Sequence, residues 1–451
     1  MQLKICKKRH LSSLIFPFMV MVLLILVLQP EWGCAQRLRR LNLIECLEIA
    51  IEKNPQLKSA EERLVRSRLQ IREAYSSIYP KLSSDFTYTH QNDPPSYLSS
   101  FGDFPFPEDN YSLSLSLQQP LFDQGKYRVL KPQAELGIEI ARLGLESARQ
   151  NIFLGVISAY LQTLKAEEML IISRESRDRL LEHLRVTKRR FEVGQVPKND
   201  VLRAEMELAN AESDQIHAEK DISLAYENLQ KILFIEGETF SVIPVRYIRQ
   251  EEMTMEDMIA RAYQKRPDYI QALKTKEVAR KGISLAKTDF FPTVSLFGEY
   301  EWSGDEFFPE DDVLVVGGSI RLPIFEGGIR SVKLRRAHHD YTLSEYEEAE
   351  IKKQIRVEVI EAFLHLEDLL ATLRAIDKQI EHAEENMRIV RLRYQEGEAT
   401  NLDVLDANLL LVKARTDFVN INYDIIGARF GIDRAIGELS MERIRHSLGE
   451  K

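Results

Sequence analysis

The apolar positions of this chain alternate with polar positions in four short segments. In Leu82–His90, for example, Leu82, Phe86 and Tyr88 fall on one side of an extended chain. A period of two over nine or more residues is typical of β-strands that present one apolar and one polar face. We therefore predict strands at about 81–91, 110–120, 292–303 and 313–323.

Elsewhere the apolar residues recur every three to four positions over very long stretches. These stretches follow Phe122 and Phe325, and no proline lies between Pro132 and Pro197 or after Pro323. The spacing predicts helices of about 65 residues, which would be about 100 Å long.

Beyond Gly194 and Gly397 the apolar pattern becomes a strict heptad, with steps of three and four residues. Large residues alternate with alanine, which favours close packing of neighbouring helices. The pattern predicts coiled-coil hairpins that turn at these two glycines. The heptad positions are Val201, Ala204, Leu208, Ala211, Gln215, Ala218, Ile222, Ala225 and Leu229, and then Val404, Ala407, Leu411, Ala414, Phe418, Ile421, Ile425 and Ala428.

The chain is a tandem duplication. The passage RFEVGQVPKNDVLRA at 190–204 returns as RYQEGEATNLDVLDA at 393–407, and the prolines before the first strand of each half, Pro80 and Pro292, also correspond. We predict two repeats of about 200 residues with little left unpaired. The predicted parts are a signal peptide at 1–35, a first repeat at 36–235, a link at 236–253, a second repeat at 254–437 and a tail at 438–451, with hairpin tips at about 192–199 and 395–402.

The N-terminus has the pattern of an export signal. Basic residues precede the apolar run LIFPFMVMVLLILVL, and Gly33 and Ala35 supply small residues for cleavage. Two alternatives are a retained membrane anchor, which Pro17 and the short run disfavour, and lipidation at Cys34.

Net charge and cysteine content bear on two points: nucleic acid as a partner and an internal disulfide. The formal net charge is −9, and removal of 1–35 makes it −12 because four basic residues and Glu31 are lost. An acidic chain disfavours nucleic acid as a partner. Cys46 would be the remaining cysteine, which rules out an internal disulfide and fits a small buried residue.

The sequence gives no positive evidence for catalysis, a cofactor or a metal. His338 and His339 are adjacent, so on a helix their side chains diverge by about 100° and are poorly placed for one metal ion. Gly317-Gly318 lies within a strand pattern and is no phosphate-binding loop. We therefore expect a protein that is not an enzyme.

Four amphipathic strands suggest a membrane barrel that one chain cannot close. The smallest closed membrane barrels have about eight strands, and open strand edges are not tolerated in lipid. Several copies would have to share one barrel, and the strand count admits a dimer or a trimer. The alternative is a periplasmic coiled-coil structural or adaptor protein, which would explain the heptads but not the strands.

The duplication, the segment LNLIECLEIAIEKNPQL at 41–57 and above all GEATNLDVLDA at 397–407 resemble the TolC family of outer-membrane efflux and secretion channels. The resemblance covers roughly residues 41–437. It implies a mainly α fold with a β-barrel portion: an α-helical barrel through the periplasm and four strands per chain in a trimeric, twelve-stranded barrel in the outer membrane. It also implies a homotrimer in contact with outer-membrane lipid, a periplasmic adaptor and an inner-membrane pump.

The resemblance further implies roles for particular residues. The pore-constriction aspartates of the family correspond to Asp403 and Asp406, and three chains would bring six carboxylates together around one axis. For Asp403 the alternative is a capping box with Thr400. That role does not explain Asp406, whose counterpart in the first repeat is Arg203.

The gate and the docking region of the family also map onto this chain. A gate link corresponds to Tyr394 and Asp200, whereas a second link of the family falls on Ala399 and Asn199 and is missing. The hairpin tips, where the adaptor would dock, correspond to Gly194, Gln195, Gly397 and Glu398.

Overall fold

The computed structural model describes residues 39–92, 94, 96–99, 102–105, 107–237, 239–248, 253–307 and 311–449. The predicted signal peptide and Cys34 lie outside these residues. The chain forms two compact units, Met1–Arg40 with Thr239–Ser241, and Leu41–Glu238 with Val242–Lys451. Apart from residues 36–40, both predicted repeats fall in the second unit, and their boundaries stay a prediction.

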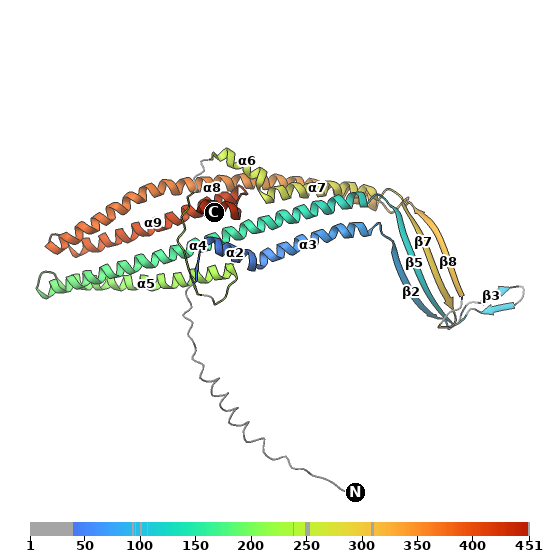
Figure 1. Ribbon diagram of the computed structural model, residues 1–451, viewed down its shortest axis with the longest axis horizontal. Coiled ribbons are helices and arrows are strands. Elements are labelled where there is room, and N and C mark those ends of the chain that lie inside the picture. Colours follow the sequence, from blue (N-terminus) through green and yellow to red (C-terminus); the bar gives the residue numbers. More distant parts are fainter. Residues whose placement is uncertain are drawn as a thin grey trace, which may run out of the picture. The chain divides into compact units, whose positions relative to one another are not determined.

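Nine helices are found among the described residues, and four of them form two long hairpins. The first hairpin joins α4 (Tyr127–Glu192) to α5 (Lys198–Leu233), and the second joins α8 (Ile329–Glu396) to α9 (Asn401–Ala435). Figure 1 shows the two hairpins side by side, with their turns at the same end. The remaining helices are α2 (Leu43–Lys53), α3 (Pro55–Ser76), α6 (Met255–Lys265), α7 (Pro267–Thr288) and α10 (Met441–Leu448).

The long helices have the predicted length, since α4 and α8 contain 66 and 68 residues. Within the described residues, no helix is long and apolar enough to cross a membrane. The heptad positions of α5 and α9 face their partner helices as predicted, and Ala204, Leu229, Ala407 and Leu411 are almost fully buried.

The four predicted strands form one antiparallel sheet in the order β2-β5-β7-β8. They are β2 (Lys81–His90), β5 (Asp109–Asp123), β7 (Thr293–Gly304) and β8 (Asp311–Arg321). Each repeat supplies one hairpin, and β5 pairs with β7 to join the two repeats. The outer strands β2 and β8 leave the sheet with two unpaired edges.

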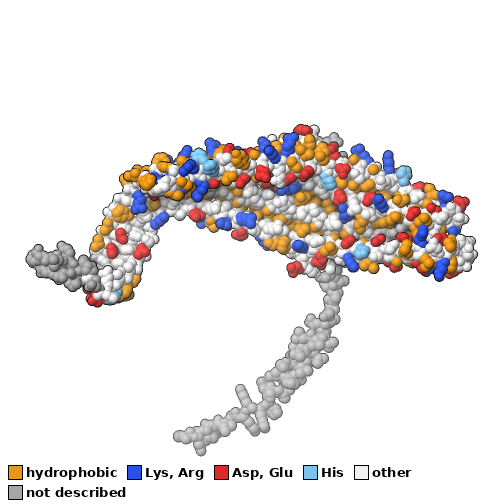
Figure 2. All heavy atoms as spheres, turned by 180° about the vertical axis from the view of Figure 1, so that it is seen from behind, with side chains coloured by type: hydrophobic (Ala, Val, Ile, Leu, Met, Phe, Trp, Pro, Cys, Tyr) orange, Lys and Arg blue, Asp and Glu red, His pale blue; other side chains and the backbone are white. Residues whose placement is uncertain are grey.

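The two faces of this sheet differ in polarity, as the period of two predicts. On one face, Phe86 lies opposite Leu113, which lies opposite Trp302. On the other face, Ser83 lies opposite Ser116 and the two hydroxyls are 2.8 Å apart. Figure 2 shows hydrophobic side chains along one margin of the sheet. Because the apolar side chains stay exposed, no other part of the described chain covers this face.

Two further small sheets were not predicted. One pairs β1 (Arg39–Leu41) with β6 (Phe240–Val242), and the other pairs β3 (Ser96–Ser99) with β4 (Gly102–Pro105). Close to Leu41, the fully buried Tyr160 hydroxyl donates to the carbonyl of Leu41 or of Ile243, at 2.9 and 2.7 Å, and accepts a hydrogen bond from the Ile243 amide. Through these hydrogen bonds, Tyr160 connects α4 to Leu41, at the start of the first repeat, and to Ile243, in the link between the repeats.

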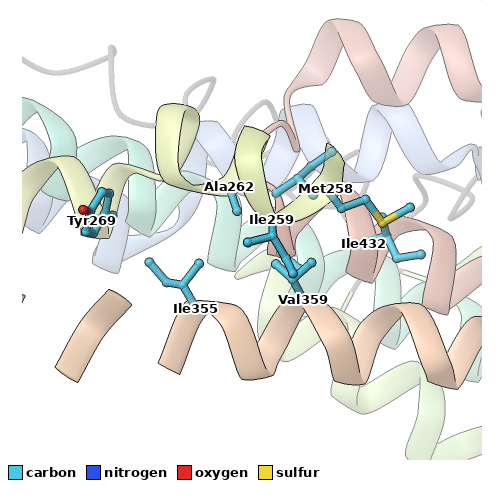
Figure 3. Close-up of a cluster of buried hydrophobic side chains, with 9 residues drawn as sticks. Met258, Ile259, Ala262, Tyr269, Ile355, Val359 and Ile432 are labelled. Atoms are coloured by element: carbon cyan, nitrogen blue, oxygen red, sulfur yellow. The ribbon is translucent and has the colours of Figure 1, made fainter. Parts of the chain in front are cut away.

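A buried cluster attaches the shorter helices of the second repeat to the long hairpin (Figure 3). Met258, Ile259 and Ala262 of α6 and Tyr269 of α7 pack on α8 and α9. The buried guanidinium of Arg266 between them binds Asp268 and Glu358, both at 2.5 Å. The core residues on the long helices are Ile355, Val359, Ile432 and Ala435, and Ile436 directly after α9 joins them.

Candidate functional site

The turns of the two long hairpins have the same local structure. Gly194 and Gly397 have φ angles of 77° and 87°, a left-handed conformation that glycine adopts without steric cost. The next amide closes each turn: Gln195 N donates to the Arg190 carbonyl and Glu398 N to the Arg393 carbonyl, both at 2.8 Å. This is the Schellman arrangement, and it presents the residues predicted as hairpin tips.

Asp403 and Asp406 both lie on an exposed face of α9, close to the second turn. Asp403 forms the capping box that the sequence offered as an alternative. Its carboxylate accepts from the Thr400 amide and hydroxyl at 2.8 Å, and its own amide donates back to Thr400 Oγ1. The bonds from Thr400, the backbone amide first, lower the pKa of Asp403, so this carboxylate stays charged at neutral pH.

Asp406 is outside the capping box, and its exposed side chain extends from the next turn of α9. Three residues apart on a helix, the two carboxylates lie on one face. The capping role therefore accounts for Asp403, whereas the pore role of both aspartates stays a prediction.

Tyr394 and Asp200 each bond to the other repeat, and they do so through different partners. The hydroxyl of the buried Tyr394 lies 2.9 Å from the Thr187 hydroxyl on α4. Asp200 contacts the second repeat through its backbone carbonyl, which accepts from Asn401 Nδ2 at 3.1 Å. A carboxylate link between Tyr394 and Asp200 stays a prediction, and it would require the tyrosine hydroxyl to leave Thr187.

The sequence analysis missed a buried histidine beside these residues. His183 Nε2 lies 2.6 Å from Asn401 Oδ1, and its ring packs on Tyr394 with 4.9 Å between centroids. Burial lowers the pKa of His183, and the bond with Asn401 offsets part of that effect. A signal was present, because His183 and Thr187 are polar residues spaced by four, which places both on one face of α4.

The other sequence candidates form no site. His338 and His339 are exposed on α8. In the part of the chain that the structure describes, no three metal-ligating side chains come together. Gly317 lies in β8, as its strand pattern predicts.

The fold and the two turns are those of an outer-membrane channel class, and comparison with known proteins gives the family. The model of the outer membrane efflux protein family matches residues 46–233 and 258–438, one segment in each repeat. The chain therefore belongs to this family. It is an outer-membrane channel protein of the class that serves efflux and type I secretion.

The similar proteins cover most of the chain at low identity. TolC of Escherichia coli is 24% identical over 88% of this chain and 83% of its own length. The alkaline protease secretion protein AprF of Pseudomonas aeruginosa is 24% identical over 86% and 82%. Among solved structures, the outer membrane protein VceC of Vibrio cholerae has a TM-score of 0.75 at 21% identity, over 88% of this chain and 96% of VceC. The similarity in structure supports the fold.

Proposed function

We propose that three copies of this chain form one passive conduit across the outer membrane and the periplasm. The observation that carries the proposal is the four-stranded sheet with unpaired edges at β2 and β8 and an exposed apolar face. Three such sheets would close a twelve-stranded barrel, in which each β8 edge pairs with the β2 edge of the next copy. Closure satisfies the backbone groups that lipid would leave unpaired.

The helical hairpins would continue the conduit into the periplasm. Their tips, at Gly194, Gln195, Gly397 and Glu398, lie at the end of the long helices opposite the sheet (Figure 1). We infer that a periplasmic adaptor binds these tips and connects the channel to an inner-membrane pump. The exposed carboxylates of Asp403 and Asp406 would face the axis and form the narrow entrance.

Assembly in detergent tests the proposal. The purified mature protein should have the native mass of a trimer and should migrate as an oligomer in gels unless it is heated. It should also conduct ions across planar bilayers. A monomer or dimer that does not conduct would contradict the trimeric conduit.

Fractionation checks the channel against the periplasmic coiled-coil protein that the sequence alone left open as an alternative. Cells that express the chain should yield it in outer-membrane fractions. Recovery in the soluble periplasm would favour the alternative. For the docking step, cysteines at Gln195 and Glu398 should crosslink to the adaptor, and failure across several linker lengths would argue against docking at the tips.

A further inference from the structure

The two hairpins of the chain have apolar cores of their own. In the first hairpin, α4 and α5 pack through Leu180, Leu184, Val201, Ala204, Leu208 and Ala211. In the second, α8 and α9 pack through Met387, Tyr394, Val404, Ala407 and Leu411. Each hairpin therefore keeps most of its core if the other moves away, although Leu405 of α9 packs in the first cluster and Val186 of α4 packs against the second.

Polar residues line much of the contact between the hairpins, together with the apolar Val186 and Leu405. On α4 they are spaced by three, four, four and three residues, which places them on one helix face. On α9, Asn401, Asn408 and Arg415 are spaced by seven, or two turns. We call this contact of α4 with α8 and α9 the polar seam; its α4 residues are Ser176, Arg179, His183, Thr187 and Arg190.

Each of the two asparagines bonds to the first hairpin through both the oxygen and the nitrogen of its side-chain amide. Asn408 Oδ1 accepts from Arg179 Nε at 2.9 Å, and its Nδ2 donates to Ser176 Oγ at 3.1 Å. Asn401 Nδ2 donates to the Asp200 carbonyl, which leaves Oδ1 to accept from His183 Nε2. Both asparagines are nearly completely buried, with 3% and 5% of their surface exposed.

Two further contacts extend the seam along α4. Arg415 binds Glu175 of α4, and at its other nitrogen Glu384 of α8 at 2.8 Å. Close to the turns, Arg190 Nη2 donates to the Gln395 carbonyl at 2.6 Å.

The seam differs from the hairpin cores in what its separation exposes. Hydrogen bonds broken at the seam are replaced by bonds to water, whereas separation of an apolar core exposes apolar surface. A cavity of about 30 Å³, roughly the volume of one water molecule, also lies beside Arg179, His183, Met387 and Tyr394. The plane that separates at lowest cost therefore runs between the hairpins.

We propose that Asn401 and Asn408 are positioning residues that hold the second hairpin against α4 when the entrance is closed. Opening then separates the two hairpins along the polar seam, and each hairpin keeps its own apolar core. The corresponding residues of the first repeat are Lys198 and Glu205, so the amide pair is particular to α9. This inference rests on the proposed channel function.

Single-channel recording of the full trimer tests the inference. The double variant Asn401→Ala/Asn408→Ala should raise the conductance of the closed entrance several-fold, because Arg179 and His183 lose their partners across the seam. Asn210→Ala is the matched control, since Asn210 is exposed on α5, and it should conduct like the wild type. Wild-type conductance of the double variant would overturn the inference. If the wild-type protein forms no channel at all, the proposed function fails as well.

A crosslink tests the same point where the double variant does not assemble. Ser176→Cys/Asn408→Cys places two thiols where the native side chains are in contact, and the native Cys46 is fully buried. A short thiol crosslinker should keep conductance low and stop export in cells, and a reducible form should restore both on cleavage. A crosslinked trimer that opens and exports like the reduced one would show that the hairpins do not separate here.

Discussion

The Tyr394 hydroxyl donates a hydrogen bond to the Thr187 hydroxyl, which lies 207 residues earlier in the chain and 2.9 Å away. The direction is fixed because Thr187 Oγ1 donates its own proton to the His183 carbonyl. The guanidinium of Arg190 lies over the tyrosine ring, 4.7 Å from its centre. Tyr394 of the second repeat is thus bound to α4 of the first by its hydroxyl and by its ring.

Replacement of Tyr394 by phenylalanine should weaken closure modestly. The variant keeps the ring contacts and removes one hydrogen bond, which contributes about 0.5–1.5 kcal/mol. Thr187 still donates to His183, so no buried proton loses its acceptor. The conductance of the closed entrance should rise by less than in the double asparagine variant.

Asp200→Ala is the informative control for that experiment. The contact from Asp200 to the second repeat is made by its carbonyl, which alanine retains. This variant should therefore conduct like the wild type. Opening by Asp200→Ala equal to that by Tyr394→Phe would instead support the carboxylate link expected from the family.

Acidification should open the entrance through His183. Its pKa is lowered in the closed state, so the closed state binds fewer protons than an open state in which the ring is hydrated. The closed state is fully stable above the ordinary histidine value of about 6.5 and is weakened as the pH falls below it. The charged groups nearby are Arg179, Glu182, Arg190, Asp200 and Arg391.

Conductance recorded from about pH 7.5 to about pH 5.5 checks this expectation. The wild-type channel should conduct more at the lower pH, whereas His183→Gln, which retains a donor for Asn401, should vary little. Equal pH responses of both proteins would exclude His183 as the titrating group. The bonds from Thr400 lower the pKa of Asp403, so this carboxylate stays charged across the window and does not account for a change in it.

The sequence predicted the elements of the fold because their signals are local. Alternation over nine or more residues located the strands, and the positive φ angles of Gly194 and Gly397 occur where the glycine turns were predicted. The capping box of Asp403 was also readable, since Thr400 is only three residues away.

The polar seam could not be predicted in the same way. Ser176 and Asn408 are separated by 232 residues, and their contact depends on how two long helices are rotated about their axes. A polar residue within a heptad can face solvent or a partner, and the heptad alone does not decide between them. The partners of Tyr394 were missed for the same reason.

Gly317→Ala should impair assembly of the barrel, whereas Gly298→Ala should be tolerated. A Cβ at Gly317 would lie 2.8 Å from Cζ of Phe297, which covers the glycine on the neighbouring strand, but a Cβ at Gly298 meets nothing within 4 Å. The yield of heat-modifiable oligomer measures the difference. Addition of Phe297→Ala to Gly317→Ala should restore the yield, and no recovery would show that the clash is not the cause.

Neighbouring residues of β5 should respond oppositely to a charge. Leu115 lies on the apolar face and Ser114 on the serine face of the same strand. Lysine on the lipid face near the bilayer midplane costs about 2–4 kcal/mol, so Leu115→Lys should reduce insertion. Ser114→Lys should insert normally and reduce the preference of the channel for cations. Equal insertion of both variants would contradict the assignment of the faces.

Asp406→Ala should raise conductance at the closed entrance and weaken block by multivalent cations. Three chains would place six carboxylates from Asp403 and Asp406 around the axis, and tight binding of a multivalent cation needs several of them.

Asp403→Ala confounds two effects, because this carboxylate also caps α9 through Thr400. Asp403→Asn separates them in part, since the amide oxygen can still accept from the Thr400 amide while the charge is lost. If the aspartates line the pore, both Asp406→Ala and Asp403→Asn should weaken the block with little change in thermal stability. If neither aspartate lines the pore and Asp403 serves only as a cap, Asp406→Ala should be blocked like the wild type, and single-channel recordings with a trivalent cation decide between the two.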